Sequence, residues 1–423
     1  YGALFQAYPK AKGVILVGES VEFPSSDPHT TRRLRLAPSP DGLPADKPSP
    51  GWWPCADYPE WLTLLQRVIR RHAPAAEIVF WTYNWGYAPE ADRLALIRRL
   101  PEGITLQVTF EMFEQLQQDG ITSVCVDYTI AFPGPGRYFQ SEAEVAHERG
   151  IRLYTMCNTG GLTWDFGVIP YEPVPYQWAR RHAALQQARE RWGLSGLMES
   201  HHFGWWPSFV SELAKAAYWE PSPEPAAVLA GLARRDFGPE GGQYALAAWR
   251  LWSEAIRDYV PTNEDQYGPF RVGPAYPLVF KRSSNLPMAS HAMFGNRIVS
   301  PNYQPHDGGR QSLGIARFPV EVRRLERMAA SWQSGIEDLE RAVERAPART
   351  QAAGQWQLNL GYFIRNAIRT TIHLKQWWLL KQRLFAESDP AVANAILDEM
   401  VALAEDELAN AAATIPYVET DSR

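Results

Sequence analysis

The chain has 423 residues, of which 45% are hydrophobic, so it can bury a large core and is not intrinsically disordered. Its 42 Lys and Arg residues against 47 Asp and Glu residues leave a net charge of −5, which argues against a protein that coats nucleic acid. No apolar run approaches the roughly 18 residues that span a bilayer. We therefore expect a soluble protein without a membrane partner, in the bacterial cytoplasm.

Five short runs begin with apolar residues and end in polar or aromatic ones, which is typical of buried parallel strands whose C-terminal ends open onto a site. These predicted strands are Lys12–Ser20, Glu77–Gly86, Ile104–Met112, Ile151–Gly160 and Leu194–His202. Apolar residues at helical spacing predict amphipathic helices between them, over Glu60–His72, Pro89–Leu100 and Gln177–Trp192. The alternation predicts an α/β fold with a parallel sheet and right-handed crossovers.

A closed (β/α)8 TIM barrel has eight strands and about 250 residues, and only five strands are visible here. Because the chain begins at Tyr1, almost on its first strand, we expect the first three strand–helix units to precede it. An open five-stranded sheet is the alternative. Ser123–Phe132 is a further strand-like run, which we interpret as an excursion from the loop above the third strand. Ala37–Pro54 and Pro133–Arg137 are predicted to be loops on the same side.

The strand pattern fades after Phe209, and helices are predicted over Ser208–Trp219, Pro225–Phe237, Gln243–Tyr259, Phe318–Arg345, Gln355–Phe385 and Pro390–Ala413. We therefore divide the chain into a barrel portion, 1–238, and an all-α helical domain, 239–423. The irregular stretch 261–314 is long for a compact chain, so we expect it to pack back over the barrel mouth.

Three glutamates, Glu19, Glu111 and Glu199, lie at predicted strand ends, where barrel enzymes carry their catalytic groups. Glycoside hydrolysis needs one carboxylic acid that protonates the leaving oxygen and a second carboxylate that acts as nucleophile or as base for water. We predict Glu19 as the acid/base and Glu199 as the second carboxylate, with Glu111 as its alternative. The carboxyl groups of the true pair should lie within about 10 Å of each other. No cofactor is needed.

The 17 Trp, 18 Tyr and 17 Phe residues suit stacking against sugar rings, because many of them lie in polar, Gly- and Pro-rich segments. The plainer interpretation of any single ring is that it fills the core. We expect the carbohydrate to be bound by Trp81, Tyr83, Asn84, Trp85, Asp127, Asn158, Asp165, His201, His202, Trp205 and Trp206. No metal site is predicted, since the adjacent His201 and His202 match no common ligand spacing.

The segment Ser200–Gly238, SHHFGWWPSFVSELAKAAYWEPSPEPAAVLAGLARRDFG, resembles the end of the barrel in family 67 α-glucuronidases and family 20 β-N-acetylhexosaminidase-like proteins. In that group the last barrel strand passes into a helix, then a W-(D/E)-P motif, then a helix that ends in FG. Trp219-Glu220-Pro221 and Phe237-Gly238 match these two motifs. The resemblance implies a barrel followed by a helical domain.

The resemblance also implies that the general acid is the glutamate at the end of the fourth strand, which corresponds to Glu19. The hexosaminidases place an Asp directly before this Glu to hold the N-acetyl group of the substrate. This chain has Gly18 there, which argues against substrate-assisted chemistry unless another acid such as Asp127 replaces it.

These features predict a glycoside hydrolase that is exo-acting on an oligosaccharide or glycan, completed by residues before Tyr1 or by assembly as a homo-oligomer. One alternative is a non-catalytic carbohydrate-binding protein, which would keep the tryptophans but not need two facing carboxylates. Another is a metal-dependent hydrolase that uses His201 or His202.

Overall fold

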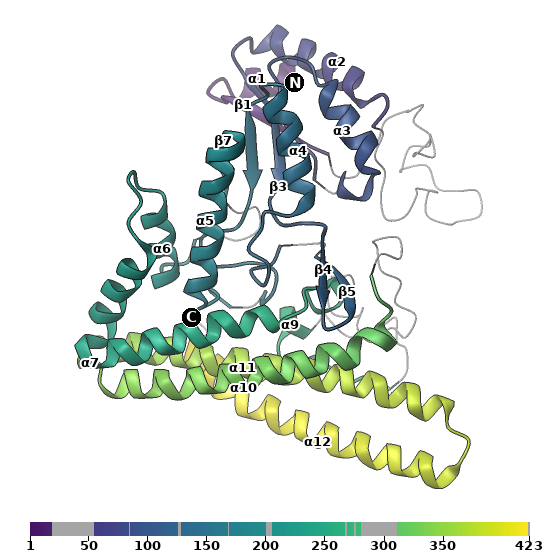
Figure 1. Ribbon diagram of the computed structural model, residues 1–423, viewed down its shortest axis with the longest axis vertical. Helices are drawn as coiled ribbons and strands as arrows, with labels where there is room; N and C mark the ends of the chain where they lie inside the picture. The colour runs from purple at the N-terminus through teal and green to yellow at the C-terminus, as the bar shows by residue number, and fades with distance from the viewer. Residues whose placement is uncertain are drawn as a thin grey trace.

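The computed structural model describes residues 1–18, 55–83, 85–125, 128–167, 169–199, 205–266, 269–274, 276–280 and 311–421. It consists of an α/β part with a five-stranded parallel sheet, followed by a region of long helices that lies below it in Figure 1. The predicted α/β class with a C-terminal helical region is confirmed. None of the described helices combines the length and the apolar character that a membrane crossing requires.

The main sheet has the strand order β1-β2-β3-β6-β7, so neighbouring strands follow one another along the chain. Its strands are β1 (Gly13–Val17), β2 (Glu77–Trp81), β3 (Thr105–Thr109), β6 (Leu153–Met156) and β7 (Leu194–Met198), and all pairs are parallel. The crossover helices are α2 (Tyr58–His72), α3 (Glu90–Arg98), α4 (Arg137–Glu148) and α5 (Pro175–Trp192). Because the order never reverses, right-handed crossovers place these helices on one face of the sheet.

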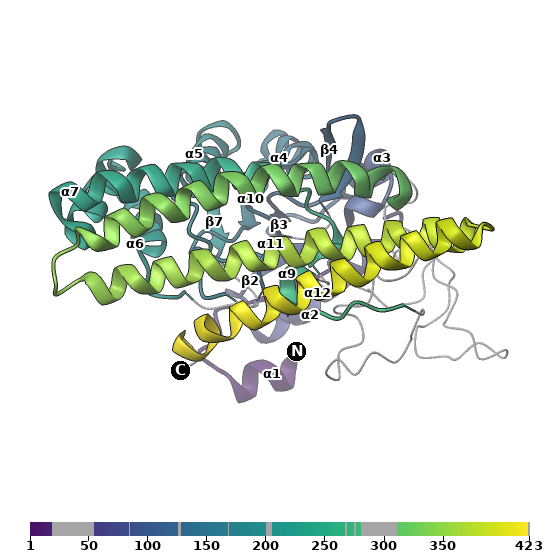
Figure 2. The same cartoon turned by 90° about the horizontal axis from the view of Figure 1, so that it is seen from below.

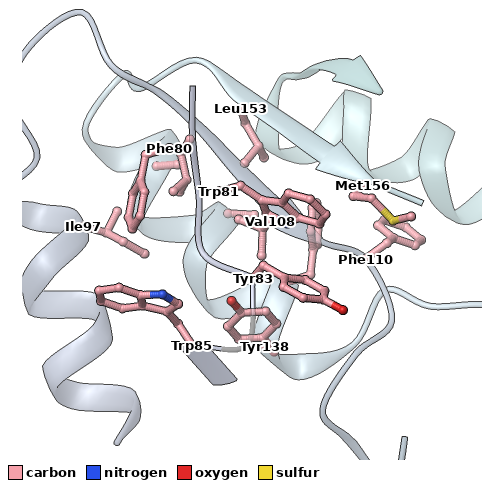
Figure 3. Packing of buried hydrophobic residues seen from close by; sticks show 14 of the residues in the cluster. Phe80, Trp81, Tyr83, Trp85, Ile97, Val108, Phe110, Tyr138, Leu153 and Met156 are labelled. Carbon is pink, nitrogen blue, oxygen red and sulfur yellow. The ribbon is translucent and has the colours of Figure 1, made fainter. Parts of the chain in front are cut away.

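The helix-covered face of the sheet is apolar and closely packed. Phe80 of β2 lies 5.1 Å from the Tyr58 ring of α2 and 5.5 Å from the Trp85 ring. Figure 3 shows Phe80, Trp85 and Ile97 grouped on one side of the sheet. Trp85 is fully buried, and its indole N–H donates to the Gly18 carbonyl at 2.7 Å.

On the opposite face of the sheet, two side chains of β1 are exposed, and no described helix covers them. Ile15 and Val17 pair in register with Val79 and Trp81 of β2, yet they are 48% and 43% exposed. In the described part of the chain, β1 and β7 each pair with one neighbour only, so the sheet is open and a closed barrel is not seen. Exposed β-branched side chains on an edge strand are a surface that native proteins normally cover.

A hairpin interrupts the strand–helix alternation after β3. It consists of β4 (Glu114–Gln118) and β5 (Ile121–Cys125), joined by Asp119 and Gly120 with φ values of 50° and 85°. A strand-like excursion was expected here over Ser123–Phe132, but β4 was not predicted, although an Asp-Gly pair between short strands is a strong hairpin signal. Helix α4 was not predicted either, and its Glu142 forms a buried ion pair with Arg93 of α3 at 2.6 Å.

The helical region begins with α6 (Phe209–Ala217) and continues with α7 (Pro225–Ala255), α10 (Gly314–Glu344), α11 (Gln351–Ala386) and α12 (Pro390–Asp421). Helix α10 packs against α7 and α11, and α12 packs on α11 (Figure 2). The expected break after Phe237 is a kink within α7, where Gly238 has φ 75°. The short elements are α1 (Gly2–Ala7), η1 (Trp85–Tyr87), η2 (Ile256–Asp258), α8 (Asn263–Gln266) and α9 (Pro269–Val272).

Residues 261–280 connect the helical region to the loops of the α/β part. The Phe270 ring lies 4.9 Å from Phe166, and the Arg271 guanidinium lies 4.8 Å from the centre of the Trp164 ring. Gln266 donates to the Tyr128 carbonyl at 2.9 Å. Of the long irregular stretch 261–314, residues 281–310 lie outside the described part, whereas Gln311 accepts the Val124 N–H of β5 at 3.1 Å.

Two stacked tryptophans hold α7 against α10. The rings of Trp252 and Trp332 lie 5.0 Å apart at 12°, and both are fully buried. The Trp252 indole N–H donates to the Trp332 carbonyl, and the Trp332 indole N–H donates to the Gly361 carbonyl. A Cβ at Gly335 would approach Trp252 Nε1 to 2.4 Å, so this glycine makes room for the ring.

We expect Trp332→Ala to lower the free energy of unfolding by about 3–5 kcal/mol, because it leaves a cavity and removes the indole hydrogen bond to the Gly361 carbonyl. Urea unfolding followed by circular dichroism measures this change. Phe385→Ala on α11 is the control, since Phe385 is 63% exposed and its removal should cost roughly 0.5 kcal/mol or less. Similar losses for the two variants would contradict the assigned role of the stacked pair.

Candidate functional site

The described part of the chain contains nine of the residues predicted for the site. They are Trp81, Tyr83, Trp85, Glu111, Asn158, Asp165, Glu199, Trp205 and Trp206. The other five, Glu19, Asn84, Asp127, His201 and His202, lie outside the described residues. Of the nine, the structure brings Glu199 and Trp205 together at the end of β7, and it places Glu111 and Asp165 in a separate buried network.

Glu199 follows β7 and is held by four hydrogen bonds. Its Oε1 accepts the backbone N–H groups of Thr159 and Gly160, at 2.7 and 2.5 Å, from the turn that follows β6. Its Oε2 accepts the Thr159 hydroxyl and, at 3.1 Å, the phenol of Tyr218 at the end of α6. Burial raises the pKa of Glu199, and these hydrogen bonds oppose the rise. The carboxyl group is thus fixed in one orientation, on a residue that is half-buried.

An exposed aromatic surface adjoins Glu199. Trp205 is 36% exposed, Trp206 is 55% exposed, and the Trp205 ring lies 6.4 Å from that of Tyr218. Gly160 permits this arrangement, because a Cβ there would lie 2.9 Å from Trp205 and 3.0 Å from Glu199 Oε1. A half-exposed indole beside a carboxylate is an arrangement that suits a sugar ring, which is apolar on one face and rich in hydroxyls at its edge.

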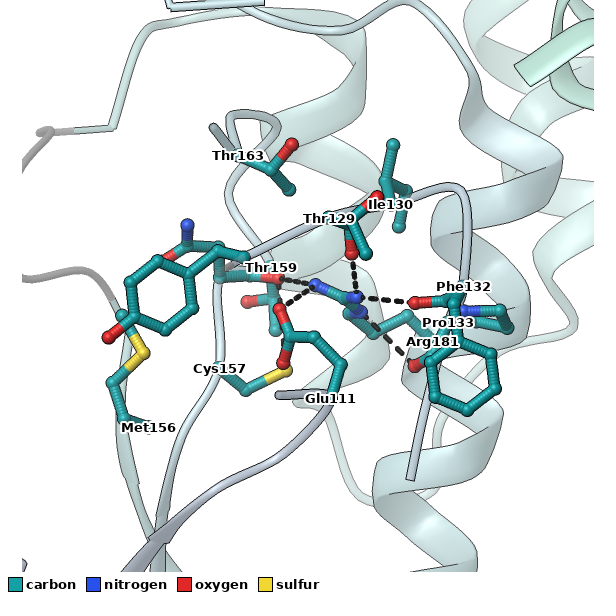
Figure 4. A network of polar contacts seen from close by, with 12 residues as sticks. Glu111, Thr129, Ile130, Phe132, Pro133, Met156, Cys157, Thr159, Thr163 and Arg181 are labelled. Carbon is teal, nitrogen blue, oxygen red and sulfur yellow. Dashed lines mark hydrogen bonds and ion pairs between the residues drawn. The ribbon is translucent and has the colours of Figure 1, made fainter. Parts of the chain in front are cut away.

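Glu111 follows β3 and is completely buried. Its Oε1 forms an ion pair with Arg181 Nη1 at 3.2 Å, while its Oε2 has no hydrogen-bond partner among the described residues. Burial raises the pKa of Glu111 to about 7, more than the Arg181 charge lowers it. Figure 4 shows the Cys157 thiol beside this carboxyl group. Glu111 is therefore enclosed by protein rather than presented at an open rim.

Arg181 of α5 connects three loops at the C-terminal edge of the sheet (Figure 4). Besides Glu111, its guanidinium donates to the carbonyls of Asn158, Thr129, Phe132 and Pro133. All five N–H donors of the side chain are therefore used. The loops after β3, β5 and β6 depend on this one residue for their relative positions.

Asp165 belongs to the same buried region, and one of its carboxylate oxygens contacts α8 of the helical region. Its Oδ2 accepts the Thr129 hydroxyl at 2.7 Å and the Ile130 N–H at 2.8 Å, and its Oδ1 accepts the Gln266 amide at 3.1 Å. Burial raises its pKa and that of the nearby Glu172. Asp165 is completely buried, and its hydrogen bond from Gln266 holds the loop against α8.

Trp81 and Tyr83 lie in the core rather than on an exposed surface. They are 3% and 7% exposed, and their rings are 4.8 Å apart. The Trp81 indole donates to the Thr109 hydroxyl at 3.1 Å, and Tyr83 stacks on Tyr128 at 6.5 Å. Asn158 is also buried, and Arg181 holds its carbonyl.

Three residues of these networks, Arg181, Thr159 and Tyr218, were not predicted from the sequence. Arg181 had a recognisable signal, because it lies at i+3 from Trp178 on the apolar face of the predicted helix, with Ala184 and Ala188. An arginine on a buried helix face requires a buried acceptor. Thr159 and Tyr218 had no such signal, since their partner is distant in sequence. In the described part of the chain, no three His, Cys, Asp or Glu side chains are grouped to hold a metal ion.

Glu111→Gln should flatten the dependence of stability on pH. A carboxyl whose pKa rises from 4.5 to about 7 on folding stabilises the protein below pH 4.5 and loses this contribution as the pH rises toward 7. We expect the free energy of unfolding of the wild type to fall over this range by about 3 kcal/mol more than that of Glu111→Gln. Urea unfolding at several pH values measures this difference between the two proteins. Glu190→Gln, which replaces an exposed glutamate, is the control. Parallel curves for all three proteins would show that the Glu111 carboxyl is not protonated on folding.

No family model matches the chain, and no curated protein matches it either. The assignment of a function to the Glu199 region consequently depends on its geometry and chemistry alone.

Proposed function

We propose that the protein is a glycoside hydrolase in which Glu199 is one of two catalytic carboxylates. The observation that carries this proposal is a half-buried glutamate at the end of a parallel strand, whose carboxylate is held by four hydrogen bonds and bordered by the exposed Trp205 indole. Parallel α/β folds bind their substrates at the carboxyl ends of the strands. The aromatic surface supplies a platform for the sugar, and the carboxylate supplies the nucleophile or the base.

Glu199 is favoured over Glu111 because of their surroundings. Glu111 is completely buried and paired with Arg181, so a substrate could reach it only after the loops around it moved. Glu199 is only half-buried, and access to its Oε2 requires the displacement of one side chain, the exposed Tyr218. We therefore assign Glu199 as the second carboxylate, Glu19 as the acid/base on the grounds of its sequence position, and Glu111 as a residue that positions the loops.

The five-stranded sheet is proposed to be part of a (β/α)8 barrel. Three observations support this: the strand order follows the chain, the crossover helices share one face, and the apolar side chains of Ile15 and Val17 on the other face are exposed. Further parallel strands beside β1 would bury these side chains. In such a barrel Glu19 and Glu199 would follow the fourth and eighth strands and would face each other across the mouth.

The test is hydrolysis of a panel of chromogenic glycosides by the full chain. Glu199→Gln and Glu19→Gln should each lower kcat/KM on the order of 10³-fold or more without unfolding the protein, because both groups act on the reacting bond. Glu190→Gln, an exposed carboxylate on α5, is the matched control and should leave activity unchanged. Activity that survives Glu199→Gln would rule out the assigned mechanism.

The exposed tryptophans also support a second candidate, a carbohydrate-binding protein without turnover. Trp205 and Trp206 would serve that function equally well, whereas Glu199 would then only hydrogen-bond the ligand. Calorimetry with unhydrolysed oligosaccharides distinguishes the two functions. Binding that is lost in Trp205→Ala, together with no hydrolysis of any glycoside by the wild type, would favour the binding protein.

A further inference from the structure

We propose that Tyr218 is a positioning residue that, together with Thr159, makes Oε2 of Glu199 the reacting oxygen of the site. This inference rests on the proposed function for its catalytic consequence, while the hydrogen bonding it describes can be tested without any activity. Tyr218 follows α6, whose N-terminus is fixed by a capping box between Ser208 and Ser211. The position of the Tyr218 phenol is therefore set by a helix whose start is fixed.

The two oxygens of Glu199 have different surroundings. Oε1 accepts two backbone N–H groups, from Thr159 and Gly160, and a carboxylate oxygen has two lone-pair directions in the plane of the group. Backbone N–H groups cannot reverse and become acceptors. A proton on Glu199 must consequently reside on Oε2, and so must any lone pair that attacks or deprotonates.

The partners of Oε2 are hydroxyl groups, which can both donate and accept. The Thr159 hydroxyl donates to Oε2 and is also bonded to the Tyr218 hydroxyl, so the three oxygens form a closed triangle. When Glu199 is ionised, the two hydroxyl protons fill two of the three contacts, and at least one of them points to Oε2. When Oε2 carries a proton, the hydroxyl groups can rotate and accept it. The triangle therefore accommodates both protonation states without a change in the backbone.

Tyr218 is the member of the triangle that a substrate can displace. Thr159 is completely buried, whereas Tyr218 is 50% exposed and lies beside the Trp205 ring. A sugar hydroxyl or a water molecule that approaches along the aromatic surface meets the phenol first. Its 3.1 Å contact with Oε2 can then give way while the Thr159 contacts keep the carboxyl group in place.

The phenol also influences the ionisation of Glu199. Burial raises the pKa of this carboxyl group, and a hydrogen bond donated to its charged form lowers it. Removal of the Tyr218 hydroxyl should therefore raise the pKa of Glu199. In the enzyme, a raised pKa of Glu199 shifts the acidic limb of the kcat/KM pH profile to higher pH. That limb reports the ionisation of the base in the free enzyme.

The first experiment compares the pH profiles of the wild type, Tyr218→Phe and, as control, Tyr8→Phe, a variant at an exposed tyrosine. We expect the acidic limb of Tyr218→Phe to move up by about one pH unit, with kcat reduced roughly tenfold and KM little changed. The control should match the wild type. A profile of Tyr218→Phe that coincides with that of the wild type would overturn the inference.

A second measurement follows the Glu199 carboxyl directly by ¹³C NMR titration of the full chain, which requires no activity. Its pKa should rise in Tyr218→Phe and in Thr159→Val, and Thr159→Ser should restore the wild-type value because it keeps the hydroxyl. If these shifts occur and no glycoside is hydrolysed, the proposed function fails and the positioning of Oε2 stands. An unchanged pKa in both Tyr218→Phe and Thr159→Val would overturn the inference even in an active enzyme.

Discussion

The buried ion pair between Arg181 and Glu111 determines how the C-terminal edge of the sheet is built. Transfer of a guanidinium and a carboxylate out of water costs several kcal/mol for each ion, and their mutual attraction alone does not offset this. Here the remaining donors of Arg181 satisfy four backbone carbonyls, so the desolvated charge is fully hydrogen-bonded. Because those carbonyls belong to the loops after β5 and β6 and the acid follows β3, a single side chain of α5 sets the shape of the rim.

The helical region completes this arrangement from the other side. Gln266 of α8 contacts both the Tyr128 carbonyl and Asp165, and the neighbouring Asp265 pairs with Lys375 of α11 at 3.0 Å. Lys375 also pairs with Glu321 of α10 at 2.6 Å, in an environment from which water is excluded. Buried polar contacts thus run from the long helices to the loops of the sheet, and the two regions support the same site.

The sequence was sufficient to predict the five strands of the main sheet, since each is an apolar run bounded by polar residues, and to predict the long helices from their periodicity. It did not predict β4, whose sequence EQLQQ is mostly polar. It was not sufficient to separate Glu111 from Glu199, because both glutamates end a strand in a similar local pattern. What distinguishes them is Arg181, which lies 70 residues beyond Glu111. Likewise, the tryptophans that follow β2 and β7 look alike in sequence, but tertiary packing buries Trp85 and leaves Trp206 exposed. Local patterns predict elements, whereas burial is decided by contacts between distant segments.

The commitment of every Arg181 donor has a consequence for the motions of the protein. A fluctuation that withdraws α5 from the sheet removes the guanidinium from Glu111 and from the carbonyls of all three segments at once. The loops after β3, β5 and β6 must then open as one cooperative unit with α5, and their amide protons must exchange with solvent at a shared rate. Glu199, held from the turn after β6, loses its two N–H donors in the same event. The geometry of the site therefore lasts as long as a single helix stays docked.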